Sequence, residues 1–112
     1  MEFEVMSNDR REKPRTIVCF DAQWEGASSR SQARVIDLSE TGCYVDAMNE
    51  TLPGEVIQLK MQLPEGEWLE LVGEVAHSAT RVGFGLRFRE IDEPQLAKLR
   101  LLLADLPKSR EE

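Results

Sequence analysis

The sequence contains few of the residues from which metal centres and nucleophilic sites are built. Its 112 residues include one histidine, His77, and two cysteines, Cys19 and Cys43. A zinc site needs several Cys, His or carboxylate ligands at short spacings, and no such group is present. Both cysteines stand in apolar strand-like segments, where a free cysteine behaves as a small hydrophobe, and neither has basic neighbours that would lower its pKa. Walker and dinucleotide-binding glycine motifs are also absent. We therefore expect no metal, no cofactor and no enzyme.

An excess of basic residues and long apolar runs are missing as well. The chain has 14 Lys and Arg against 21 Asp and Glu, a formal net charge of -7. Sequence-independent nucleic-acid binders usually carry the opposite balance. No apolar run approaches the length that spans a bilayer, and the first residues, MEFE, lack the apolar region of a signal peptide. We expect a cytoplasmic protein that neither binds nucleic acid nor inserts into a membrane.

What the sequence does contain is a series of short strand-like segments. The clearest has Leu59, Met61 and Leu63 alternating with polar residues, which is typical of a half-buried strand. Turn residues separate the segments, and this pattern predicts a small antiparallel barrel or sandwich. Trp24 and Trp68 are expected to pack in its core or at its rim. The predicted strands cover residues 16–20, 33–38, 42–47, 56–63, 68–79 and 84–88.

The last part of the chain changes to a helical period. Asp92 can cap a helix, Pro94 fits its first turn, and Gln95 stands at the capping-box position. Leucines then recur at helical spacing up to Pro107, at positions 96, 99, 103 and 106, with Leu102 beside them. We therefore predict a domain over residues 15–107, preceded by a flexible, charged arm (1–14) and followed by a frayed tail (108–112).

Two polar segments carry the chemistry. Residues 37–42 (DLSETG) lie between two predicted strands, and their Asp, Ser and Gly favour a tight turn, which a plain hairpin would also use. Residues 10–15 (RREKPR) form a dense basic patch before the first strand. An acidic acceptor and a hydroxyl in one segment, with guanidinium groups in the other, suit a ligand that has both hydrogen-bond donors and phosphate.

These two segments fit the patterns R-x-x-x-R and [DN]-x-S-x-x-G. Their order, and the GFGLRF strand before an acidic helix start, resemble the PilZ domain family from about Arg10 to about Leu106. The resemblance implies a six-stranded β-barrel that binds the second messenger cyclic di-GMP. It also implies that the first motif lies on the N-terminal arm and the second on the barrel surface.

The resemblance assigns the arginines to the nucleotide. Guanine presents N7 and O6 as paired acceptors, which Arg can meet with two parallel donors, and Arg also pairs with phosphate oxygens. Arg11 and Arg15 are therefore expected to hold guanine edges and phosphate. Arg10 is expected to stack or to contact a second phosphate. Because Arg10 could contact a second copy of the nucleotide, its presence favours a stacked pair of nucleotides over a single one, and the sequence leaves both alternatives open.

The second motif supplies the remaining expected contacts. Asp37 can accept from the N1–H and N2–H₂ edge of guanine, Ser39 offers a hydroxyl to base or phosphate, and Gly42 leaves room for the backbone to approach the ligand. His77 has two interpretations: its ring stacks on a guanine if it faces the site, or it is a half-exposed strand histidine.

The resulting hypothesis is a cyclic di-GMP receptor or adaptor whose arm becomes ordered on binding and alters a surface for an unidentified protein effector. The main alternative is a PilZ-like interaction module that does not depend on the nucleotide, as in degenerate members that serve type IV pilus assembly. Such members usually lack the arginine motif, which this chain has.

Overall fold

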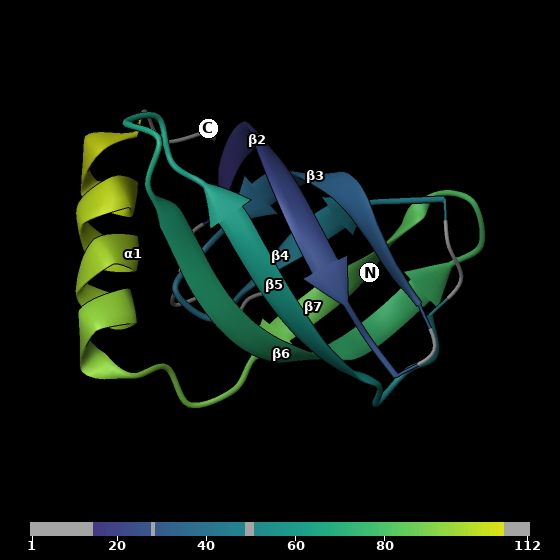
Figure 1. Ribbon diagram of the computed structural model, residues 1–112. Coiled ribbons are helices and arrows are strands. Elements are labelled where there is room, and N and C mark those ends of the chain that lie inside the picture. Colours follow the sequence, from purple (N-terminus) through teal and green to yellow (C-terminus); the bar gives the residue numbers. More distant parts are fainter. Residues whose placement is uncertain (1–14, 28, 49–50, 107–112) are drawn as a thin grey trace, which may run out of the picture.

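The computed structural model describes residues 15–27, 29–48 and 51–106 (Figure 1). Over these residues six antiparallel strands close into a barrel in the order β2-β3-β4-β7-β6-β5, and one helix follows. The predicted six-stranded barrel with a C-terminal helix is thus confirmed, while the predicted arm (1–14) and tail (108–112) lie outside the described residues. The elements are β2 (Thr16–Glu25), β3 (Arg30–Leu38), β4 (Gly42–Asp46), β5 (Val56–Gln62), β6 (Trp68–Ala79), β7 (Gly83–Phe88) and α1 (Glu93–Asp105).

Strand β2 is longer than the sequence predicted, and this extension closes the barrel. The prediction ended the strand at residue 20, but Ala22 and Trp24 continue the alternation and are both buried. Trp24 pairs with Ser31 of β3 on one side and with Leu59 of β5 on the other. The second half of β2 therefore pairs with β5, the last strand of the barrel order, and so closes the barrel. β3 correspondingly begins at Arg30, before the predicted start at residue 33.

The core is filled by the inward-facing side chains of all six strands. Trp24 and Phe84 meet edge to face inside the barrel, with ring centroids 5.3 Å apart and planes at 77°. Trp24 is only 2% exposed, as expected for a packing residue, and its Nε1 has no hydrogen-bond partner among the described residues. The other fully buried side chains include Val35, Leu38, Cys43, Val45, Ile57, Leu59, Met61, Leu69 and Leu99.

The two cysteines lie on opposite sides of the barrel wall. Cys43 is buried in the core, as predicted, but Cys19 is exposed. The segment Ile17 to Phe20 is apolar throughout, so its sequence gives no alternation from which to read the inner face. Cys19 shares the outward phase of Ile17, which is 69% exposed.

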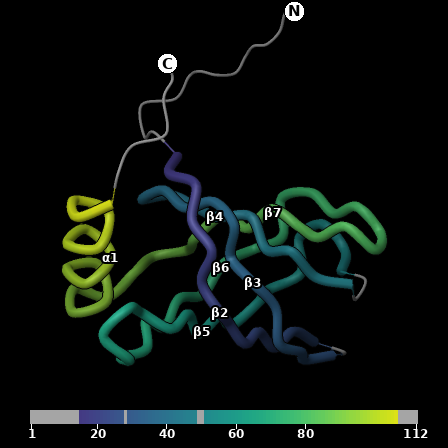
Figure 2. The backbone as a smooth tube through the Cα atoms, turned by 90° about the horizontal axis from the view of Figure 1, so that it is seen from above, coloured from purple at the N-terminus to yellow at the C-terminus, as the bar shows by residue number. Residues whose placement is uncertain are grey.

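Helix α1 lies beside β6 at one side of the barrel (Figures 1 and 2). Asp92 caps it by accepting from the backbone N of Gln95 at 3.0 Å, as predicted. The amide oxygen of Gln95 accepts from the backbone N of Glu70 at 2.9 Å, so it pins the helix to β6. Leu99 and Leu102 are buried in the core. Among the described residues, no helix is long and apolar enough to cross a membrane.

Candidate ligand-binding site

Arg15 and Asp37, one from each polar motif, meet on the outer wall of the barrel. Arg15 directly precedes β2, and β2 pairs with β3 so that Ile17 faces Asp37. Arg15 Nη1 donates to Asp37 Oδ1 at 2.7 Å, with the two side chains 50% and 21% exposed. An ion pair this open to solvent adds little to stability, about 0–1 kcal/mol. Its position beside the DLSETG turn makes it the centre of the candidate site.

A β-bulge turns Asp37 outward. Up to Val35, the odd-numbered residues of β3 face the barrel interior, and regular alternation would send Asp37 inward as well. The pairing of β3 with β4 shifts between Val35 and Asp37, and Leu38 becomes the next buried residue. Bulges commonly re-aim a side chain next to a functional site. Here the shift places a carboxylate on the surface without opening the core.

Ser39 organises the turn itself. It is 3% exposed, and its backbone N donates to the carbonyl of Gly42 at 2.9 Å. Its Oγ accepts from the backbone N of Thr41 and of Gly42, both at 3.2 Å. The hydroxyl therefore replaces backbone partners that this tight turn cannot supply. The predicted contact of Ser39 with a ligand stays a prediction.

Gly42 is required where β4 meets β7. It is buried and faces Arg87 across the strand pair. A Cβ at this position would collide with the carbonyl oxygen of Leu86. The structure thus gives a packing reason for this glycine, beside the predicted room for a ligand, which stays a prediction.

Four facing positions on four adjacent strands form a row across the outer wall. Asp37 faces Tyr44, Tyr44 faces Gly85, and Gly85 faces His77, on β3, β4, β7 and β6 respectively. Facing residues of antiparallel strands point to the same side of the sheet. A second bulge, between Val75 and His77, turns His77 outward after the buried Val75. His77 therefore lies on the same wall as Asp37.

Tyr44, like Gly85, is a residue of this row that the sequence did not predict for the site. Its ring stacks with the His77 ring at a centroid distance of 6.0 Å and an interplanar angle of 28°. The available signal was local: Tyr44 stands between Cys43 and Val45, both buried, so it had to face outward. Which side chains it would meet there depends on pairings distant in sequence.

The turn also contacts the end of β7 and helix α1. The carbonyl of Thr41 accepts from the backbone N of Phe88 at 2.8 Å. Glu40 pairs with Arg100 of α1, with Oε2 and Nε 3.4 Å apart. The turn is therefore fixed to two other elements. Of the other predicted site residues, Arg10 and Arg11 lie outside the described residues, and their roles stay predictions.

Cys43 and His77 do not form a cysteine–histidine pair. Burial raises the pKa of the Cys43 thiol well above its usual range, the nearby Asp37 carboxylate raises it further, and Arg15 lowers it. Cys43 points into the core while His77 is exposed on the outer wall. In the part of the chain that the structure describes, no three His, Cys, Asp or Glu side chains group so that they could hold a metal ion.

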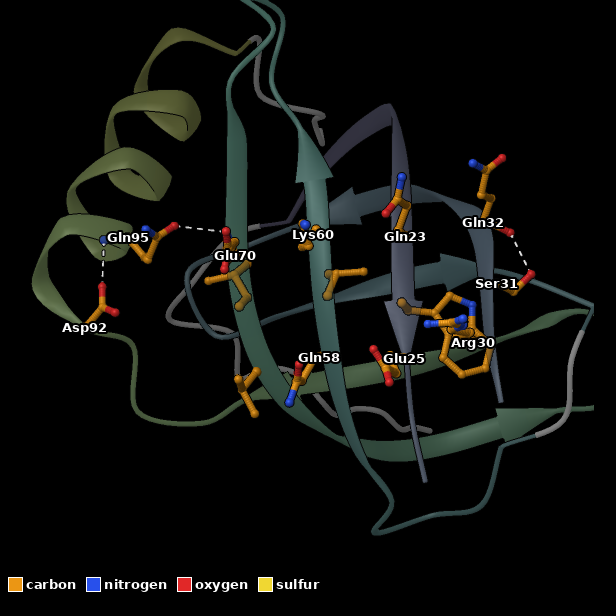
Figure 3. Close-up of a pocket in the computed structure, with 14 residues that line it drawn as sticks. Gln23, Glu25, Arg30, Ser31, Gln32, Gln58, Lys60, Glu70, Asp92 and Gln95 are labelled. Carbon is orange, nitrogen blue, oxygen red and sulfur yellow. Dashed lines mark hydrogen bonds between the residues drawn. The ribbon is translucent and has the colours of Figure 1, made fainter. Parts of the chain in front are cut away.

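A pocket of about 690 Å³ lies elsewhere on the barrel, over β2, β3, β5 and β6 and beside the start of α1 (Figure 3). None of the described motif residues lines it. Its lining has several amide side chains and mixed charges, with Glu25 and Glu70 near Lys60 and Arg30. Such a mixture does not select a phosphate, so we place the candidate site at the Arg15–Asp37 wall.

Comparison with known proteins identifies the family. The model of the PilZ domain matches residues 9–105, and the chain therefore belongs to the PilZ domain family. One similar structure is that of the Bacillus subtilis inhibitor of motility (MotI/DgrA), with a TM-score of 0.71 and 19% identity over 87% of this chain. Another is the PilZ domain of CeSA from a cellulose-synthesizing bacterium, with a TM-score of 0.62, 20% identity, and coverage of 80% of this chain and 95% of that one. At such identities the likeness shows the fold. The chain spans about half (51%) of the Bacillus subtilis protein, and no curated protein matches the sequence.

Proposed function

We propose that this domain is a cyclic di-GMP receptor that binds the dinucleotide on the wall carrying Arg15 and Asp37. PilZ domains are a cyclic di-GMP-binding family rather than a family of enzymes. The observation that carries the proposal for this chain is the 2.7 Å contact between Arg15 and Asp37, which joins the two motifs at one place. Neither motif alone would indicate a site.

The chemistry of the pair matches guanine. The N1–H and N2–H₂ edge of the base offers two donors side by side, and a carboxylate has two oxygens to accept them. Asp37 already accepts from the planar guanidinium of Arg15, a group with a similar array of N–H donors. Arg15, in turn, can serve the N7 and O6 acceptors of guanine or a phosphate oxygen. The two side chains together can read two adjacent edges of a guanine base.

Further contacts extend along the same wall and onto the arm. His77 lies three strands from Asp37, about 14 Å away at the usual spacing of about 4.8 Å between strands. A ligand with two bases can therefore engage both ends of the row, with His77 stacking on a guanine. Arg10 and Arg11 would add phosphate contacts from the arm.

The proposed output is a change of surface. Ordering of the arm over the barrel on binding would create a surface for a protein effector. The turn between β3 and β4 contacts α1 through Glu40 and Arg100, so a ligand at the turn also lies close to the helix.

A calorimetric titration of the purified protein with cyclic di-GMP, with GMP and GTP as controls, tests this proposal. We expect saturable binding of the cyclic dinucleotide and little heat from the controls. The molar ratio distinguishes a single nucleotide from a stacked pair. Absence of binding to cyclic di-GMP would contradict the proposal and favour the nucleotide-independent interaction module.

A further inference from the structure

We propose that Tyr44 and Gly85 are positioning residues of this site, which fix the His77 imidazole so that it presents a ring surface to a planar base. The inference rests on the proposed function, because it concerns how the same wall holds the dinucleotide. Neither residue belongs to the two sequence motifs. Gly85 belongs to the GFG segment of β7, which the sequence reasoning left without a role.

The outer side of β7 is shaped to hold two rings. Gly83 and Gly85 face outward on this strand, while Phe84 between them is fully buried in the core. A Cβ at Gly83 would lie 2.9 Å from Cε2 of Tyr44. A Cβ at Gly85 would collide with Nε2 of His77 and lie 2.7 Å from its Cε1. The two side chains thus reach across β7 from either side, over positions that carry no side chain.

Gly85 has no other evident reason to be glycine. Gly83 has a positive φ of 152°, and a Cβ there would also collide with the carbonyl of Val45, so its backbone requires glycine. Gly85 does not have a positive φ, and the three atoms nearest to its hypothetical Cβ all belong to the His77 ring. The glycine at 85 therefore serves the position of the imidazole.

Tyr44 supplies the other constraint on that ring. The two rings stack at 6.0 Å and 28°, within the range of favourable offset pairs. Tyr44 is half-buried and held by its strand, whereas His77 is exposed. A solvent-exposed side chain normally loses rotamer freedom when it binds a ligand. A ring that is already fixed by Tyr44 and seated on Gly85 loses less, so the stacking contributes more to affinity.

The contact can first be measured without nucleotide. The chain has one tyrosine and one histidine, so a nuclear Overhauser effect between their ring protons has a single assignment. We expect this signal in the unmodified protein and its loss in Gly85→Ala, whose added methyl group displaces the imidazole. Absence of the signal from the unmodified, folded protein would overturn the inference whatever the variants do.

The second measurement is the affinity for cyclic di-GMP. We expect Tyr44→Leu to weaken binding about three- to tenfold, and Tyr44→Phe, which keeps the ring, to restore nearly full affinity. His77→Ala should weaken binding roughly five- to a hundredfold, the usual range for loss of one stacked base, with Gly85→Ala close to it. In the His77→Ala background, Tyr44→Leu should have almost no further effect, because Tyr44 acts through His77.

The outcomes separate the inference from the proposed function. If the unmodified protein does not bind cyclic di-GMP, the proposed function fails and the inference fails with it. If the unmodified protein binds, two results would overturn only the inference. One is that Tyr44→Leu binds as tightly as the unmodified protein, and the other is that Tyr44→Leu lowers the affinity as much in the His77→Ala background as in the unmodified protein. Should Tyr44→Leu fail to fold, Gly85→Ala makes the same comparison with Tyr44 in place, and the Overhauser measurement needs no variant.

Discussion

The guanidinium of Arg15 lies 2.7 Å from the carboxylate of Asp37, although the two residues are 22 positions apart in the sequence. Pairing of β2 with β3 brings them together, and a bulge in β3 turns Asp37 toward the surface. The barrel itself therefore presents one residue from each motif at a single place. Substitutions at this pair and in the adjacent turn separate its role in ligand binding from its role in the fold.

Arg15→Ala should weaken cyclic di-GMP binding by about 1.5–3 kcal/mol, the usual value of a hydrogen bond to a charged group. The fold should be unaffected, because the side chain is half exposed and its ion pair contributes about 0–1 kcal/mol. Arg11→Ala should behave in the same way. Calorimetric titration measures the affinity, and a thermal melt measures the stability.

The matched control for this variant is Arg34→Ala. Arg34 pairs with Asp21 across the same two strands, with Nε and Oδ1 3.9 Å apart and both side chains largely exposed. The Arg34→Ala variant should leave the affinity for cyclic di-GMP unchanged. An equal loss in both variants would mean that only the overall charge matters, and a melting temperature that fell with the affinity would mean that Arg15 supports the fold.

Asp37→Ala should weaken binding by about 1–3 kcal/mol, because the two donors of the guanine edge lose their acceptor. The direction of the change in affinity distinguishes two roles of the carboxylate. Cyclic di-GMP carries two negative phosphates, so removing a nearby carboxylate would strengthen binding if Asp37 acted only through its charge. Asp21→Ala is the control. Unchanged or tighter binding by Asp37→Ala in a titration would contradict its role as a base reader.

Ser39→Ala should lower the free energy of unfolding by about 1–3 kcal/mol, because two backbone N–H groups of the turn lose their acceptor. Ser31→Ala removes a hydroxyl on β3 that, within the described residues, bonds only to the adjacent carbonyl of Gln32, and it should change stability much less. Urea unfolding measures both. Undiminished stability of Ser39→Ala together with lost affinity would show that the hydroxyl serves the ligand rather than the turn.

The strands and the helix could be predicted from the sequence where alternation is regular. β6 has the predicted bounds, Trp68–Ala79, and Asp92 caps α1 as expected. The errors lie where apolar and polar residues do not alternate along the segment. Ile17 to Phe20 is apolar throughout and conceals the outward face of Cys19, and the closing half of β2 is recognised only when Trp24 is seen between Ser31 and Leu59.

The candidate site was predictable in its residues more than in its geometry. The motifs indicated Asp37, but only the pairing of β2 with β3 shows that it meets Arg15. The side of the sheet to which the His77 side chain points could not be deduced, because a bulge after Val75 reverses the alternation of inward and outward residues. Its contact with Tyr44 needs the registers of two strand pairs, β4 with β7 and β7 with β6, and no local sequence pattern encodes these.

Binding of the nucleotide should protect the arm. Residues 10–15 are rich in charge and directly precede β2, whose first residue, Thr16, is buried. We predict that amide hydrogen exchange over residues 10–15 slows markedly when cyclic di-GMP is added. Exchange within β5, which contributes no residue to the row from Asp37 to His77, provides the internal reference and should change little. Equal protection of the arm with and without nucleotide would contradict the proposed ordering.

The most direct test of the account is the ratio of affinities for cyclic di-GMP and cyclic di-AMP, measured by titration of the unmodified protein under one set of conditions. The two ligands share the phosphate ring, but adenine lacks both the N1–H and N2–H₂ donors assigned to Asp37 and the O6 acceptor assigned to the arginines. Sites that hydrogen-bond a substrate group reject an analogue lacking it by about 10⁴–10⁵-fold. The account predicts far weaker binding of cyclic di-AMP. Comparable affinities would contradict it and leave only a phosphate-binding patch.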